Sequence, residues 1–325
     1  MNRKLCTTLF VSALAARAAG PALAQQQTQH SQYMNNNYLL NPAVAGTEDY
    51  IDAKFSSRLQ WTGLEGSPNT YYASVHSSLG KWRTQPKRTL HDRHRGFHAL
   101  GGIAYNDVTG PTSRAGLYGS YAYNLALTPT VRLALGASVG MQQFAIDGEK
   151  LRFHDPNNHP GNQASRMLDG TVGVWLYSPS YYVGISGAQL FANALDFSYA
   201  QTTPVGAANA LQRHYFGTVG GRVPLGADWA LVPSVLVKVV SAAPVSVDFS
   251  AKLRYRDSFW VGASVRPSDS VVALFGVNFA EYASLGYSYD TGISQLAAYH
   301  WGSHEVVLGL KLKKTPKVVC TDRFW

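Results

Sequence analysis

The stretch from Val245 to Tyr255 alternates between apolar and polar side chains, and this pattern constrains the fold more than any other feature of the chain. Successive side chains of a strand point to opposite faces, so one face is apolar while the other carries Asp248, Lys252 and Arg254. A transmembrane β-barrel needs this arrangement, because lipid surrounds its outside and polar groups line its lumen. Half-buried strands of soluble sheets look similar, so the prediction depends on whether the pattern recurs.

Segments of roughly ten residues, the length that a tilted strand needs to cross a bilayer, recur along the chain. We predict strands at 50–61, 69–79, 96–106, 113–126, 130–145, 169–178, 180–187, 212–224, 228–241, 245–256, 258–266, 271–280, 282–290 and 303–313. In the last of these, Lys311 and Lys313 lie opposite an apolar face and are predicted to face the lumen. The sequence therefore predicts an all-β fold, a transmembrane antiparallel β-barrel of about 14 strands within residues 50–313.

The lengths of the links between these strands support a barrel. The links near 127–129, 178–179, 226–227, 257 and 281 are short. The long links fall in the opposite phase, at 146–168, 188–211 and 291–302. Outer-membrane barrels have short periplasmic turns and longer surface loops, whereas a soluble exported β-sandwich has no reason to sort its links in this way.

The first 24 residues are typical of a secretory signal peptide, with a basic start at Arg3 and Lys4 and a small-residue cleavage site at Ala22–Ala24. We therefore expect export to the bacterial outer membrane and a mature chain that begins near Gln25. Beyond this leader, no segment has about 18 consecutive apolar residues, which excludes a helical membrane protein. Residues 314–325 are predicted to form a C-terminal periplasmic tail.

Residues 25–49 lack strand-like alternation and are rich in asparagine. We expect either a periplasmic segment or a plug-like segment folded into the lumen, where amide side chains can satisfy inward-facing polar groups.

The link at 80–95 should be periplasmic, yet it is long and strongly basic. Its six basic side chains are predicted to bind a partner: Lys81, Arg83, Lys87, Arg88, Arg93 and Arg95. The expected partner is an acidic periplasmic protein or the cell wall, and a solvated loop is the alternative. Nucleic-acid binding is not expected, because the chain is exported and its other basic residues are scattered.

Aromatic residues near strand ends predict contact with the membrane–water interface. Trp61 follows the first predicted strand, and Tyr287 and Tyr289 lie in the strand at 282–290. Amphipathic rings favour the level of the lipid headgroups, so these three residues are predicted to belong to an interface girdle in contact with outer-membrane lipid.

The chain offers little support for catalysis, a cofactor or a metal site. The motifs G-x-S-x-G, H-E-x-x-H and G-x-x-x-x-G-K-[ST] are absent from the sequence. His91, His94 and His98 are spaced like metal ligands but have no acidic or cysteine cluster beside them. We therefore expect a non-enzymatic protein.

Five short motifs stand in a distinctive order. They are Ser31-Gln32-Tyr33-Met34, Asn41-Pro42-Ala43-Val44-Ala45-Gly46, the stretch from Gln60-Trp61 to Asn69-Thr70, Gly286-Tyr287-Ser288-Tyr289-Asp290, and Ser303-His304-Glu305. Together they resemble the PorP/SprF family of type IX secretion system membrane proteins from Bacteroidetes, over essentially the whole mature chain.

The resemblance implies an outer-membrane barrel that serves type IX secretion or gliding motility. It also implies contact with periplasmic ring subunits of that system and with secreted proteins that carry sorting domains. The alternative is a passive transporter of hydrophobic molecules, similar to fatty-acid channels. That alternative predicts an apolar lumen and a lateral opening, for which Pro233 is the candidate kink.

Overall fold

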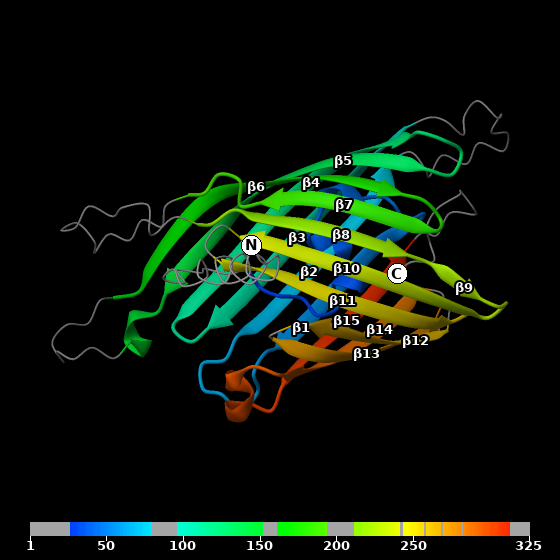
Figure 1. The fold of residues 1–325 in the computed structure, drawn as a ribbon. Coiled ribbons are helices and arrows are strands. Elements are labelled where there is room, and N and C mark those ends of the chain that lie inside the picture. Colours follow the sequence, from blue (N-terminus) through cyan, green and yellow to red (C-terminus); the bar gives the residue numbers. More distant parts are fainter. Residues whose placement is uncertain are drawn as a thin grey trace, which may run out of the picture.

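The computed structural model describes residues 27–79, 96–151, 161–193, 211–240, 243–256, 258–267, 269–280 and 282–312. The chain forms a closed antiparallel β-barrel (Figure 1). Its strands are β1 (Ile51–Leu59), β2 (Asn69–Leu79), β3 (Phe97–Thr109), β4 (Thr112–Ala126), β5 (Arg132–Ile146), β6 (Gln163–Tyr177), β7 (Tyr181–Ala188), β8 (His214–Gly221), β9 (Val223–Leu225), β10 (Trp229–Val240), β11 (Ala243–Tyr255), β12 (Phe259–Arg266), β13 (Ser270–Ala280), β14 (Ala283–Gly292) and β15 (Ser303–Leu312). The predicted all-β barrel is confirmed.

Strands β8 and β9 are two parts of one barrel strand, which makes fourteen strands from the 15 segments. Both pair with β10 in the same register, β8 from Ser234↔Gly220 onward and β9 from Leu231↔Val223 onward. Pro233 of β10 lies at the interruption and has no N–H to donate to a neighbouring strand. Where the sequence predicts a kink, the structure has a local interruption of the pairing between β10 and its neighbour. The register of the two strands is the same on both sides of the interruption.

The barrel closes where β1 pairs with β15, from Ile51↔Leu312 to Leu59↔His304. Closure pairs the backbone of every strand with two neighbours, as a strand in lipid requires. Side chains alternate as predicted: Phe249 is 53% exposed on the outside, whereas Asp248 is 5% exposed on the inside. No helix in the described ranges is long and apolar enough to cross a membrane.

The two ends of the barrel differ in the links they carry. The short-turn end has the links 127–131, 178–180, 226–228, 256–258 and 281–282, together with the longer link between β2 and β3. The long-link end has 60–68, 147–162, 189–213 and 293–302, together with three links of two or three residues. The five links that the sequence predicts to be short are thus short, and all five lie at the same end of the barrel.

One long link is shorter than the sequence predicts. The link expected at 146–168 covers only 147–162, because β6 begins at Gln163, six residues before the predicted strand. The missed residues include Arg166, whose Nε donates to Gln143 Oε1 at 2.8 Å on the outer surface. The alternation of apolar and polar residues is lost in this part of β6, because its outer face carries polar side chains. Strands β5 and β6 extend here past the apolar part of the outer face.

Residues 27–50, which we call the luminal segment, run inside the barrel (blue in Figure 1). The segment contains three short 3₁₀ turns, η2 (Tyr33–Asn35), η3 (Asn37–Leu39) and η4 (Pro42–Val44). It starts at the long-link end, where Thr28 donates to Asp107 at 3.1 Å, and reaches the short-turn end before β1 begins. The main hydrophobic core lies between this segment and the wall, and it includes Tyr33, Tyr38, Trp175 and Tyr182.

Several predicted parts of the chain lie outside the described residues. They are the signal peptide at 1–24, the basic link at 80–95 with its six predicted partner-binding residues, and the tail at 314–325. Two further 3₁₀ turns, η6 (Gly148–Lys150) and η8 (Gln295–Tyr299), lie in links at the long-link end.

Candidate functional site

A buried ionic group joins the start of the luminal segment to the barrel wall. Arg58 Nη2 lies 2.8 Å from Asp290 Oδ2, and Arg58 Nη1 lies 3.2 Å from Glu305 Oε2. Arg58 Nη1 also donates to Ser31 Oγ at 2.7 Å, and Ser31 N donates to Glu305 Oε2 at 2.9 Å. Ser31 Oγ in turn donates to Asp290. We call these four residues the anchor cluster.

Burial makes the anchor cluster sensitive to the loss of any member. The side chains of Arg58, Asp290 and Glu305 are 3%, 4% and 0% exposed. Charges removed from water are tolerated only when they are paired and hydrogen-bonded, and both carboxylates here depend on one guanidinium. Gln32 strengthens the junction by donating from Nε2 to the Glu305 carbonyl at 2.9 Å. Three of the five sequence motifs therefore meet at this point.

Further along the segment, polar side chains pair with serines of the wall. Tyr33 Oη donates to Ser250 Oγ at 3.1 Å, and Asn36 Nδ2 donates to Ser74 Oγ at 2.9 Å. Tyr38 Oη lies 2.5 Å from Ser120 Oγ. These serines belong to β11, β2 and β4, so the segment is held from several sides of the lumen. The polar side chains of the inner wall thus gain hydrogen-bond partners from the luminal segment.

The motif at 41–46 fits the segment closely against the wall. Asn41 Oδ1 accepts from Ala43 N at 2.9 Å, while its Nδ2 donates to the carbonyls of Val174 and Ile185 at 3.0 and 3.2 Å. Gly46 has φ +70°, and a Cβ on it would lie 2.5 Å from the Cβ of Ala99. Glycine is required here both by the backbone angle and by the close approach.

The residues predicted to line the lumen face inward wherever the structure describes them. Asp248 pairs with Arg266 at 2.7 Å. Lys252 Nζ donates to Asn35 Oδ1 at 3.1 Å and lies 5.1 Å from the ring centre of Trp260. Arg254 is buried, and Lys311 Nζ lies 5.6 Å from the ring of Tyr50. Lys313 lies outside the described residues.

The predicted girdle residues divide into two groups. Tyr287 is 40% exposed on the outer face, with its hydroxyl 2.7 Å from His304 Nδ1, and Tyr289 donates to the Trp301 carbonyl at 2.8 Å. Trp61 differs from the expectation, because it adopts φ +51° and lines the inner mouth at the long-link end. The turn after β1 rotates this side chain away from the lipid side, which the sequence pattern did not indicate.

Sequence reasoning missed the anchor cluster and an aromatic group at the short-turn end. Glu305 lies in phase with Lys311 along one strand, so alternation alone was sufficient to place it inside. The aromatic group lies at the short-turn ends of β10, β11 and β12 and consists of Trp229, Tyr255 and Phe259. The ring centres of Trp229 and Tyr255 are 4.7 Å apart, and those of Tyr255 and Phe259 are 5.3 Å apart. The sequence signal for this group was an aromatic residue at the same end of each of three consecutive predicted strands.

The described part of the chain has no group of three or more His, Cys, Asp or Glu residues arranged to hold a metal ion. His98, one of the three spaced histidines, is the second residue of β3 and points outward, with Nδ1 2.6 Å from the Tyr121 hydroxyl.

Comparison with protein families decides the identity. The family model described as type IX secretion system membrane protein PorP/SprF matches residues 22–310. The chain belongs to the PorP/SprF family. With its barrel fold, it is an outer-membrane component of the type IX secretion system. No match was found among curated proteins.

Solved structures show more distant likeness. The CymD monoaromatic hydrocarbon channel has 12% identity and a TM-score of 0.49, covering 92% of this chain and 99% of CymD. The toluene transporter TbuX of Ralstonia pickettii has 7% identity and a TM-score of 0.48, covering 91% and 99%. Omp33 of Acinetobacter baumannii has 10% identity and a TM-score of 0.47, covering 82% and 100%. With TM-scores below 0.5, nothing about the function of this PorP/SprF protein follows from them.

Proposed function

We propose that this PorP/SprF protein is a non-enzymatic barrel that holds or anchors secreted cargo at the outer membrane and contacts periplasmic ring subunits. The observation that carries the proposal is the luminal segment, which is bonded to β1, β2, β4, β11, β14 and β15 along its length. A lumen occupied in this way suits a plugged barrel that presents surfaces to partners better than a conduit for solutes.

The cargo surface is proposed at the long-link end, on the link 293–302. This link exposes Ile293 by 53%, Tyr299 by 72% and Trp301 by 82%. Large apolar side chains gathered in an exposed link mark a surface for a protein partner. The remaining long links, 147–162 and 189–213, connect strands at the same end and are proposed to take part in cargo binding.

Contact with the ring subunits is proposed at the short-turn end. The basic link at 80–95 connects β2 and β3 at this end of the barrel. Its charge favours an acidic partner surface, and Lys87 and Arg88 are the central pair of the six basic residues.

The test is site-specific photo-crosslinking in intact cells. A photoreactive amino acid at Trp301 should capture a secreted protein with a sorting domain, and one at Lys87 should capture a ring subunit. The same reagent at Trp229, on the lipid-facing side of β10, is the control and should capture neither. Absence of protein adducts from both test positions, with the barrel correctly folded, would refute the assignment.

The alternative, passive transport of hydrophobic molecules, has less physical support. Hydrophobic solutes need an apolar path, whereas Asp248, Lys252 and Arg58 are charged and face the interior. Uptake of a hydrophobic solute into liposomes that contain the intact protein would favour the alternative.

A further inference from the structure

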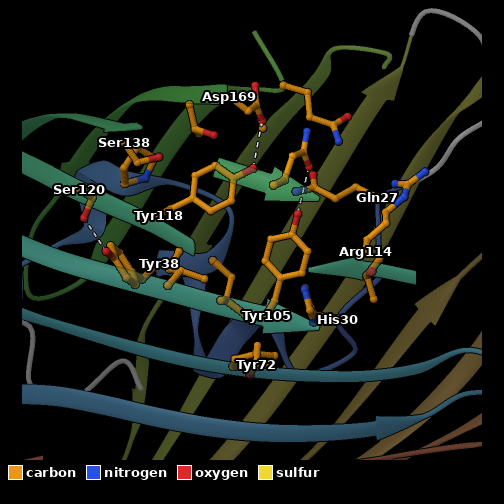
Figure 2. A pocket seen from close by; sticks show the side chains of 18 of the residues that line it. Gln27, His30, Tyr38, Tyr72, Tyr105, Arg114, Tyr118, Ser120, Ser138 and Asp169 are labelled. Carbon is orange, nitrogen blue, oxygen red and sulfur yellow. Dashed lines mark hydrogen bonds between the residues drawn. The ribbon is translucent and has the colours of Figure 1, made fainter. Parts of the chain in front are cut away.

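A cavity lies beside the luminal segment, against the inner faces of β2 to β7 (Figure 2). Its volume is about 80 Å³. A single water needs roughly 10–15 Å³ on this measure, so the cavity has room for a small organic ring. It extends from Tyr38 and Ser120 in the middle of the lumen to Gln27 and Arg114 near the long-link end.

Two tyrosine rings form a flat platform on the wall of this cavity. A Cβ on Gly116 would lie 2.5 Å from Tyr105 Cε1, and a Cβ on Gly140 would lie 2.6 Å from Tyr118 Cγ. The Tyr105 ring therefore lies across Gly116, and the Tyr118 side chain leaves its backbone directly beside Gly140. The two rings are nearly parallel, with centres 6.1 Å apart and planes 18° apart. Both tyrosines line the cavity.

Hydrogen bonds fix the platform and leave polar atoms without partners. Tyr118 Oη donates to Asp169 Oδ2 at 3.3 Å, and Tyr105 Oη donates to Gln142 Oε1 at 3.1 Å (dashed in Figure 2). The other atoms of these groups, Asp169 Oδ1 and Gln142 Nε2, are buried and have no hydrogen-bond partner among the described residues. The same is true of Gln27 Oε1 and Gln189 Oε1, which also belong to lining residues.

Unpaired buried polar atoms cost free energy, so four at one cavity call for a hydrogen-bonding partner, which is either water or a ligand that displaces it. Three are acceptors and one is a donor, which restricts the chemistry. An ammonium cannot accept from Gln142 and is repelled by Arg114, whereas a carboxylate cannot donate to Asp169. A hydroxyl both donates and accepts. An apolar ring would leave all four atoms unpaired.

We propose that this cavity binds a neutral, hydroxyl-rich ring of the size of one sugar unit. The ring packs its less polar face on Tyr105 and Tyr118, and its hydroxyls pair with Asp169 and Gln142. The cavity is completed by Gln27, Thr28 and His30, so the luminal segment forms one of its walls. The proposal does not depend on the role in secretion, because it uses only the cavity and its lining.

The test uses the full mature protein, purified in a detergent without a sugar headgroup. Saturation-transfer NMR is recorded with glucose, galactose, mannose and N-acetylglucosamine, and with choline as a cationic comparison. At least one sugar should bind, and choline should not. Asp169→Asn keeps the shape of the side chain but replaces an acceptor with a donor, and it should weaken binding at least about tenfold.

Matched variants separate binding from folding. Asp228→Asn changes an exposed aspartate in a turn, and Tyr255→Leu removes a ring on the outer face, so both should bind like the unchanged protein. Tyr118→Leu should weaken binding, and Ser138→Phe should abolish it by filling the cavity. Heat-modifiable migration on gels confirms that each variant is folded. Absence of sugar binding to the folded protein, an undiminished signal in folded Asp169→Asn and Ser138→Phe, or binding of choline instead would overturn the proposal.

Discussion

Arg58 is the side chain on which the start of the luminal segment depends most. It is the only cation paired with Asp290 and Glu305 within the anchor cluster, and all three side chains are buried. Arg58→Leu leaves two carboxylates unpaired, which should lower the free energy of unfolding by about 3–5 kcal/mol. The midpoint of urea unfolding in detergent measures this loss. Arg256→Leu removes an exposed ion pair with Asp228 and should change the midpoint little, so equal effects of the two substitutions would contradict the assignment.

Gly46 tests how closely the segment approaches the wall. Gly46→Ala places a Cβ 2.5 Å from the Cβ of Ala99 at φ +70°, so the segment must shift. The expected cost is about 1–3 kcal/mol, from overpacking and backbone strain together. Gly226→Ala is the matched control, because its φ is +78° but nothing lies within 4 Å of the added Cβ. Thermal unfolding should therefore separate the two variants, and equal melting temperatures would show that the close approach has no cost.

The luminal segment as an element is proposed to close the barrel. Deletion of residues 25–47 removes the side chains that pair with Ser74, Ser120 and Ser250, and should open an aqueous path lined by polar groups. Single-channel conductance in planar bilayers should be large for the deletion variant and near zero for the intact protein. Arg58→Leu, which keeps the segment but weakens its anchor, should open intermittently. Unchanged conductance in a correctly folded deletion variant would refute closure by this segment.

The outer face of the whole molecule exposes large apolar side chains, as expected for a surface in contact with lipid. Ile185, in the middle of β7, is 67% exposed, and Leu225, beside the short-turn end, is 48% exposed. Arginine should cost about 2–4 kcal/mol at Ile185 and about 0–1 kcal/mol at Leu225, since the cost depends on depth in the bilayer. The folded fraction in lipid vesicles measures both. Similar losses at the two positions would mean that the face around Ile185 is not at the bilayer centre.

The sequence by itself determined the barrel, a strand number of about 14 and the two faces of most strands. Asp248 and Phe249 show why: neighbouring residues of a strand point to opposite sides, so the pattern is local and can be read without knowing any partner. The resemblance was also readable from motifs. Alternation failed where a strand runs past the apolar band, as at Arg166, and where a turn rotates a side chain, as at Trp61.

Only the tertiary structure decided what the motifs do. Ser31 and Glu305 are separated by 274 positions, and Arg58 and Asp290 by 232, yet the four residues form one cluster. Their meeting depends on the register in which β1 pairs with β15 and on the path of the luminal segment. The same holds for Asp169, Tyr118 and Gln142, whose neighbourhood is set by the pairing of β4, β5 and β6. Contacts across a closed lumen arise from the barrel as a whole, because no local pattern specifies which inward side chains will face each other.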